Sequence, residues 1–142
     1  MTFVLDTSVV PELRKVRSGK ADPAVADWAA SLPSAQLFAS SITMHELEHG
    51  VLLAERADPA KGAVLRQWLD DSVAAAFDQR VLAVDAAVAR RAAALHVPDP
   101  APFRDALIGA TALVHQTTLA TRIVHDFVRF DGLEVINPWQ TR

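Results

Sequence analysis

The sequence contains no cysteine, so it can form no disulfide bond, thiolate metal site or cysteine nucleophile. A cysteine-free chain suits the reducing cytoplasm, which is the expected location. Long apolar runs are also absent, since no hydrophobic stretch approaches the length that spans a bilayer. No basic segment followed by a hydrophobic core opens the chain, and we therefore expect no secretory signal and no membrane association.

An excess of positive charge is missing as well. The net charge of −3 and the pI of about 5.9 argue against a generally basic protein that coats nucleic acid. They leave room for a local basic rim around an acidic site. The chain is instead 51% hydrophobic and rich in alanine, which predicts a compact, helix-rich globule. Its 142 residues fit one domain, and no repeat or linker divides residues 1–142.

Short β-branched or apolar runs alternate with stretches of helical periodicity. Strands are predicted at residues 2–5, 36–39, 81–84, 118–121 and 133–136. Helices are predicted at 9–14, 22–32, 42–56, from 59 to about 69, 86–95 and 103–115, with Asp22, Asp58 and Asp85 as helix caps. This alternation predicts an α/β fold with a mostly parallel sheet between helices. In such sheets, sites form beyond the carboxyl ends of the strands.

Four acidic residues stand at the ends of, or within, otherwise apolar segments: Asp6, Glu46, Asp105 and Asp126. Each one alone is more often a cap, a turn residue or a solvated helix residue. A carboxylate beside apolar surface is costly to bury, and several carboxylates repel one another unless a cation compensates them. A divalent cation held by oxygen ligands is the usual remedy. The ordered set therefore predicts a hard-metal site assembled from distant parts of one domain.

Five segments carry a family resemblance. They are VLDTSVV at 4–10 with Glu12 to Lys15, SITMHEL at 41–47, DALIGATA at 105–112, TRIVHDF at 121–127 and VINPW at 135–139. In this order they resemble PIN-domain proteins, and most closely the VapC-type ribonuclease toxins of bacterial toxin–antitoxin pairs. The resemblance covers nearly the whole chain.

The resemblance implies a three-layer α/β/α PIN-like domain with a mostly parallel sheet of about five short strands. It also implies an Mg²⁺-dependent or Mn²⁺-dependent endoribonuclease that acts as the toxin of a type II pair. The implied partners are an RNA substrate, a cognate antitoxin and a second copy of the chain in a homodimer, with assembly of toxin and antitoxin into a hetero-oligomer.

Residue by residue, the resemblance places the family's acids on Asp6, Glu46, Asp105 and Asp126. Asp6 and Asp105 are the expected direct metal ligands. Glu46 and Asp126 are expected to bind directly, through water or at a second ion. Hydrolysis of a phosphodiester needs charge neutralisation and a nucleophile at neutral pH, and Mg²⁺ or Mn²⁺ held by carboxylates supplies both.

Other polar side chains are expected to support this site. The hydroxyls of Thr7 and Thr121 are placed to orient carboxylates or metal-bound water. Cationic residues are expected to meet the phosphates of RNA, and the candidates are Arg122, Arg14, Lys15, Arg104 and Arg129. An antitoxin segment is expected in an apolar groove, and the helices near Val9, Val51 and Trp68 are candidates for lining that groove or a dimer face.

Two alternatives remain open. The segment from His45 through Glu46 to His49 matches the H-E-x-x-H pattern of zinc metalloproteases, although the longer signature is missing and the other three acids go unused. The second alternative is a catalytically inactive PIN-like module that only binds. It rests on Ile123, which replaces a frequent asparagine of the family; Ser8 is a similar departure.

Overall fold

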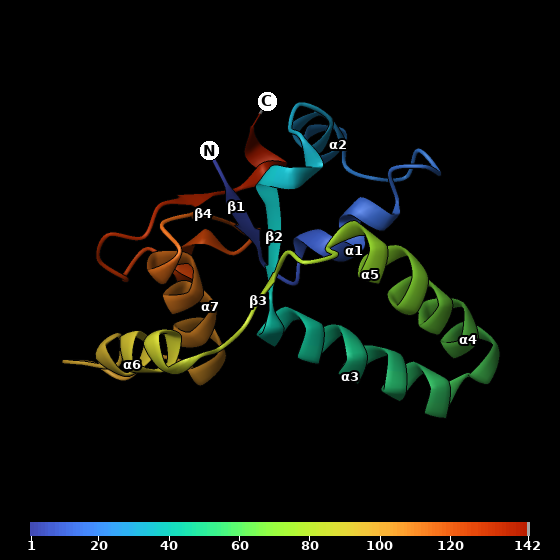
Figure 1. Ribbon diagram of the computed structural model, residues 1–142. Helices are drawn as coiled ribbons and strands as arrows, with labels where there is room; N and C mark the ends of the chain where they lie inside the picture. The colour runs from blue at the N-terminus through green and yellow to red at the C-terminus, as the bar shows by residue number, and fades with distance from the viewer. Residues whose placement is uncertain (142) are drawn as a thin grey trace.

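Five parallel strands form one sheet in the order β3-β2-β1-β4-β5 (Figure 1). The computed structural model describes residues 1–141. The strands are β1 (Phe3–Leu5), β2 (Leu37–Ser40), β3 (Val81–Leu82), β4 (Thr118–Ala120) and β5 (Val135–Ile136). Strand β1 is central, and the chain adds strands first on one side of it and then on the other. All five strands were predicted, and the sheet is parallel throughout.

Seven α-helices connect and cover these strands. Within residues 1–141 they are α1 (Val9–Arg14), α2 (Pro23–Ala30), α3 (Ser41–Ala57), α4 (Pro59–Gln67), α5 (Ala74–Ala76), α6 (Ala86–Ala94) and α7 (Phe103–Val114). The predicted caps are confirmed, because Asp22, Asp58 and Asp85 each accept a hydrogen bond from a backbone N–H in the first turn. No helix in residues 1–141 is both long and apolar enough to cross a membrane.

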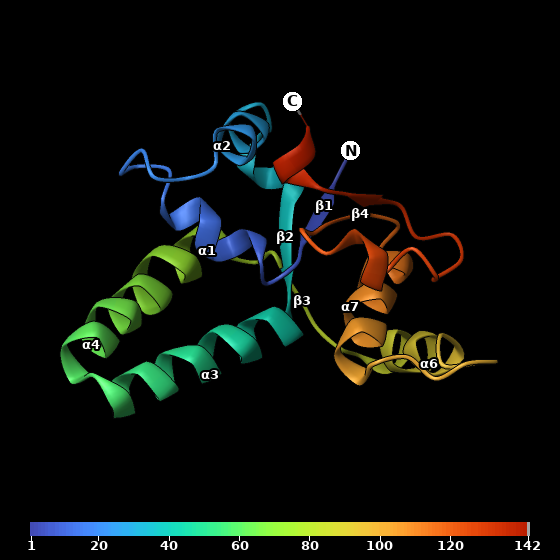
Figure 2. The ribbon, with the colours of Figure 1, turned by 180° about the vertical axis from the view of Figure 1, so that it is seen from behind.

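The two faces of the sheet carry separate hydrophobic cores. Side chains of a strand alternate between faces, so Phe3 and Leu5 pack with Trp28 on one side while Val4 packs with Ile108 on the other. Helices α1 and α2 cover the first face and α7 the second, with α6 packed on α7 (Figures 1 and 2). The predicted three-layer α/β/α arrangement is therefore confirmed.

Helices α3 and α4 form a hairpin that projects from the sheet (Figures 1 and 2). Their backbones approach closely at Gly62, and Arg66 of α4 pairs with Glu55 of α3 at 3.0 Å. The helix predicted after residue 59 continues beyond α4 through a π-helical turn, Trp68–Val73, into α5. Val64 was predicted on the inward side but is exposed, because α4 has α3 as its packing partner and turns its other side to solvent.

Candidate active site

Asp6 stands directly after the central strand. Its backbone N–H continues the sheet by donating to the carbonyl of Ala120 at 2.8 Å, and strand alternation turns its side chain toward the α7 face. The carboxylate is buried, and Oδ2 accepts hydrogen bonds from the hydroxyls of Thr121 at 2.8 Å and Ser8 at 3.2 Å. Burial of this charge is thus compensated by local donors, as a buried carboxylate requires.

Glu46 reaches the same place from α3, which begins immediately after β2. Ser40 caps this helix by accepting a hydrogen bond from the N–H of Thr43 at 3.1 Å. Thr43 and Glu46 then lie on one side of the helix, one turn apart. The hydroxyl of Thr7 contacts the Thr43 hydroxyl at 3.0 Å and donates to Oε1 of Glu46. The segment after β1 therefore fixes the glutamate.

Asp105 lies in the first turn of α7, next to Arg104, whose guanidinium joins three acids. Its Nη2 lies 2.8 Å from Oδ1 of Asp6, its Nε 2.6 Å from Oε2 of Glu46 and its Nη1 2.9 Å from Oδ1 of Asp105. Three of the four acids picked out in the sequence thus converge on one positive group. The prediction that these acids come together in space holds for them.

Asp126 lies beside this group. It ends the short 3₁₀ turn Val124–Asp126 that follows β4, and its side chain is partly exposed. Oδ1 lies 3.1 Å from Nε2 of His125. Its charge also reaches the cluster, because burial first and then the nearby charge of Asp126 raise the pKa of Asp105.

The electrostatics of the cluster differ from acid to acid. Burial alone would raise the pKa of Glu46, but hydrogen bonds from Arg104 and Thr7 outweigh it and hold this pKa below its ordinary value. Burial keeps the pKa of Asp105 above its ordinary value despite the hydrogen bond from Arg104. Burial opposes the charge of Arg104, yet the surrounding carboxylates raise its pKa further. One positive charge therefore does not fully compensate the acids.

The supporting residues fall into three groups. Thr7 and Thr121 donate hydrogen bonds to the carboxylates of Glu46 and Asp6, respectively. Arg122 stacks over the ring of Trp139 at 5.1 Å, and its backbone N–H donates to the Ser8 hydroxyl, so it lies on the rim of the site. Arg104 was predicted to meet RNA phosphates, but its guanidinium binds the acids instead, because three carboxylates surround it.

Two residues that support the site were not predicted: Thr43, whose hydroxyl contacts that of Thr7, and Ser8, whose hydroxyl donates to Asp6. The spacing of Thr43 and Glu46, three residues apart on one predicted helix, is the sequence signal that would have placed the two on a shared side. Ser8 was noted as a departure from the family pattern. It occupies the cap position of α1 without a side-chain cap bond, and its hydroxyl turns to Asp6.

The donor set fits a hard divalent cation. All four groups are carboxylates, which Mg²⁺ and Mn²⁺ prefer, and the bound guanidinium shows that the cluster takes a cation. Within residues 1–141 no three histidine or acidic side chains are drawn together closely enough to hold an ion as they stand. At this cluster the guanidinium lies between the carboxylates.

The histidines that flank Glu46 do not join the cluster. His45 and His49 are exposed, with ring centroids 6.3 Å apart. Glu46 between them is bound by Thr7 and Arg104. A zinc protease needs this glutamate free beside a zinc ion held by both histidines and a further ligand. The described residues give that arrangement no support.

The chain matches the PIN domain model over residues 3–123 and belongs to the PIN-domain family. Among curated proteins it is 33% identical to VapC ribonuclease Y4jK of Sinorhizobium fredii, over 97% of this chain and 98% of that one. It is 34% identical to Toxin FitB of Neisseria gonorrhoeae, and the alignment covers 96% of this chain and 98% of that toxin. It is also 48% identical to Ribonuclease VapC14 of Mycobacterium tuberculosis, where the alignment covers 54% of this chain and 72% of that ribonuclease.

Solved structures agree with these relatives. The crystal structure of FitAcB from Neisseria gonorrhoeae superposes with a TM-score of 0.87 at 31% identity, covering 98% of this chain and 99% of that one. DNA-bound VapBC from Salmonella typhimurium superposes at 0.72 with 18% identity, over 97% and 98%, which shows the shared fold alone. The resemblance to VapC-type toxins that was drawn from sequence motifs is thereby confirmed.

Proposed function

We propose that this chain is a VapC-type endoribonuclease that cleaves RNA phosphodiester bonds with Mg²⁺ or Mn²⁺. It acts in the cytoplasm as the toxin of a type II toxin–antitoxin pair. The observation that carries this proposal is the convergence of Asp6, Glu46 and Asp105 on one cation at the carboxyl end of a parallel sheet. Relatives named as VapC ribonucleases support it.

In this proposal Asp6 and Asp105 hold the metal directly, and Glu46 and Asp126 complete the acidic set. A divalent ion there supplies charge neutralisation on the phosphate and an activated water. Thr121 and Thr7 keep the carboxylates of Asp6 and Glu46 in place through their hydroxyls. The guanidinium of Arg122, pre-positioned on Trp139 at the rim, contacts a backbone phosphate of the RNA.

The test is a cleavage assay on structured RNA with Mg²⁺ or Mn²⁺. Asp6→Asn removes a ligand charge and is expected to abolish cleavage, with its fold checked by circular dichroism. Asp85→Asn is the matched control, because asparagine also caps a helix and this residue lies at α6. A purified wild type that cuts no RNA with either ion would instead support the inactive binding module.

A second assay addresses the protease alternative. Metal analysis of purified protein is expected to find no stoichiometric zinc, because His45 and His49 are exposed and share no further ligand within the described residues. Stoichiometric zinc that disappears in His49→Ala would overturn this expectation. The measurement needs no RNA and is therefore independent of the cleavage assay.

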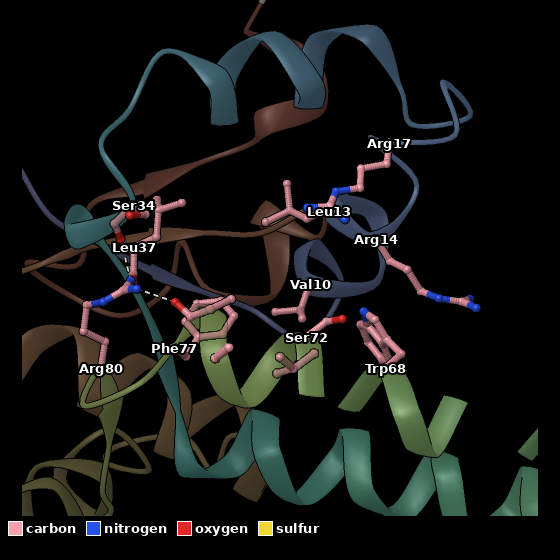
Figure 3. A pocket seen from close by; sticks show the side chains of 13 residues that line it. Val10, Leu13, Arg14, Arg17, Ser34, Leu37, Trp68, Ser72, Phe77 and Arg80 are labelled. Atoms are coloured by element: carbon pink, nitrogen blue, oxygen red, sulfur yellow. Dashed lines mark hydrogen bonds between the residues drawn. The ribbon is translucent and has the colours of Figure 1, made fainter. Parts of the chain in front are cut away.

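We further propose that a cognate antitoxin binds in the groove between α1 and the turn leading to α5. The groove encloses about 590 Å³. Figure 3 shows Val10 and Leu13 on one side and Phe77 and Trp68 on the other. Structural neighbours are toxin–antitoxin complexes, FitAcB and FitAB among them, which supports such a partner.

Arginines at this groove indicate the chemistry of the partner. The guanidinium of Arg14 lies 5.7 Å from the centre of the Trp68 ring, that of Arg80 lies 5.9 Å from Phe77, and Arg17 also lines the groove. An antitoxin segment with apolar side chains would fit the apolar lining of the groove, and acidic side chains next to them would pair with its arginines. Co-purification with the small protein encoded beside this chain's gene tests the match. Arg14→Glu is expected to weaken it, and Arg90→Glu on α6 is expected to leave it unchanged.

The proposed assembly is a homodimer of the chain that joins its antitoxin in a hetero-oligomer. Sedimentation of the purified chain, alone and with the antitoxin, measures both states. A chain that sediments as a monomer at all concentrations would contradict the dimer without touching the proposed activity.

A further inference from the structure

The guanidinium of Arg104 lies at the point where the acids meet. Its Nε, Nη1 and Nη2 each donate to a carboxylate of a different residue. A guanidinium is a rigid planar fork, so three bonds of this kind fix its centre among the oxygens. The contacted oxygens belong to three of the four residues proposed to hold the divalent ion. Arg104 is part of the chain and comes from the helix that also carries Asp105.

We propose that Arg104 is an internal competitor of the divalent cation, and that the ion binds only when the guanidinium has left the carboxylates. This inference rests on the proposed metal-dependent function. Mg²⁺ requires oxygen ligands at about 2.0–2.1 Å. Carboxylates that are held around a guanidinium with N···O distances of 2.6–2.9 Å cannot close on an ion at the same place. The guanidinium of Arg104 and the divalent ion therefore cannot occupy the space between the carboxylates at the same time.

Removal of the guanidinium leaves most of the site in position. Thr121 and Ser8 still hold Asp6, and Thr7 still holds Glu46. These hydroxyls are independent of Arg104, so they still position Asp6 and Glu46 while the carboxylates close on an entering ion. The Arg104 side chain is 36% exposed and sits in the first turn of α7, and its flexible stem can carry the head group into solvent.

The exchange has a functional consequence. Without an ion, the guanidinium relieves repulsion among the acids and stabilises the fold. With an ion, the acids are compensated again, and the released guanidinium lies at the mouth of the site. Because only the open state binds, the apparent metal affinity is reduced by the fraction of molecules in which Arg104 has left. Arg104 therefore sets the cation concentration at which the site fills.

Mn²⁺ binding to the metal-free chain tests the proposal without RNA. Arg104→Gln removes the charge and keeps an unbranched polar side chain, although a shorter one. Isothermal titration or the EPR signal of free Mn²⁺ is expected to show about ten-fold or stronger tightening relative to wild type. Arg90→Gln on α6 removes an equal charge away from the acids and is expected to bind Mn²⁺ as wild type does. Equal affinity of wild type and Arg104→Gln would overturn the competition.

The outcomes separate this inference from the proposed function. Equal Mn²⁺ affinities with intact cleavage would overturn only the competition. No Mn²⁺ binding by either folded protein would overturn both proposals. If Arg104→Gln fails to fold, NMR of the wild-type Arg104 Nε–H replaces it. That proton, bonded to Glu46 without metal, is expected to lose protection from exchange when Mg²⁺ is added, and unchanged protection would overturn the competition.

Discussion

The hydroxyl of Thr121 donates a 2.8 Å hydrogen bond to Oδ2 of Asp6, which lies 115 positions away in the chain. The two residues directly follow the neighbouring parallel strands β1 and β4, which pair in register from Phe3 with Thr118 to Leu5 with Ala120. Both side chains are buried. The register of the sheet therefore sets the position of the first acid of the site.

Loss of this bond is expected to destabilise the metal-free fold. Thr121→Val keeps the shape of the side chain but leaves the Asp6 carboxylate without its nearest hydroxyl donor. A hydrogen bond to a buried charge contributes about 1.5–3 kcal/mol, so urea unfolding at pH 7 should show a loss in this range.

The matched control for this change is Thr117→Val. The Thr117 hydroxyl donates to the neutral carbonyl of Ala112 at 3.3 Å, and the residue is only partly buried. Its loss is expected to cost about 0.5–1.5 kcal/mol, the range for an uncharged hydrogen bond. Equal losses for the two valine variants would show that the Asp6 contact carries no special contribution.

Much of this site followed from local sequence patterns. Asp6 after an apolar run and Asp105 in a helical first turn are features of short segments, and parallel strands with their ends at one edge bring such segments together. Helix caps such as Asp85 could also be predicted from the sequence, because the hydrogen bond of a cap joins residues only three positions apart. The family motifs supplied the order of the acids.

The role of Arg104 was not readable. An arginine next to an aspartate in sequence can turn to solvent, to phosphate or to the acids, and only the tertiary arrangement of β1, α3 and α7 decides. The π-helical turn after α4 could not be predicted either, because the apolar pattern of residues 59–69 is also compatible with a regular α-helix. Exposure of Val64 depends on how far the hairpin projects, which is a property of the whole fold.

Asp105→Asn is expected to abolish cleavage and to stabilise the metal-free fold or leave it unchanged. Burial holds the pKa of Asp105 above its ordinary value of 3.8, so the folded state binds this proton more tightly than the unfolded state. The ionised residue therefore lowers stability at neutral pH, and asparagine removes that effect while still accepting the bond from Arg104. Cleavage is expected to fall at least about a hundred-fold.

Unfolding as a function of pH measures this difference. The stability advantage of Asp105→Asn over wild type is expected to be largest near pH 7 and to vanish as the pH falls through the raised pKa of Asp105 toward 3.8. A marked loss of metal-free stability in the variant at pH 7 would contradict the expectation.

Glu46→Gln is expected to show the opposite pH dependence. Burial would raise the pKa of Glu46, but the bonds from Arg104 and Thr7 lower it below the ordinary value of 4.5. The folded state thus favours the ionised form, and this contribution is present above pH 4.5 and is lost as the pH falls through the lowered pKa. The variant should be less stable than wild type at pH 7 and approach it in acid. An advantage of the variant at pH 7 would show that burial outweighs Arg104.

The α3–α4 hairpin offers a matched pair of glycines. A Cβ at Gly62 would lie 2.3 Å from the Cα of Glu55, whereas a Cβ at Gly50 would meet nothing within 4 Å. Both residues are helical, so alanine improves helix propensity equally at each. Gly50→Ala is expected to raise the free energy of unfolding by up to about 1 kcal/mol. Gly62→Ala is expected to lower it by about 1–3 kcal/mol, because backbone must move to admit the methyl group.

Thermal and urea unfolding of both alanine variants, without metal, measure the two effects. The comparison isolates the close approach of the helices, because the chemical change is identical. Since Glu46 and Glu55 belong to the same helix, a shift of α3 in Gly62→Ala should reach the acid cluster and reduce cleavage, while Gly50→Ala should leave cleavage intact. Stabilisation of similar size in both variants would mean that α3 and α4 lie farther apart than the contact at Gly62 requires.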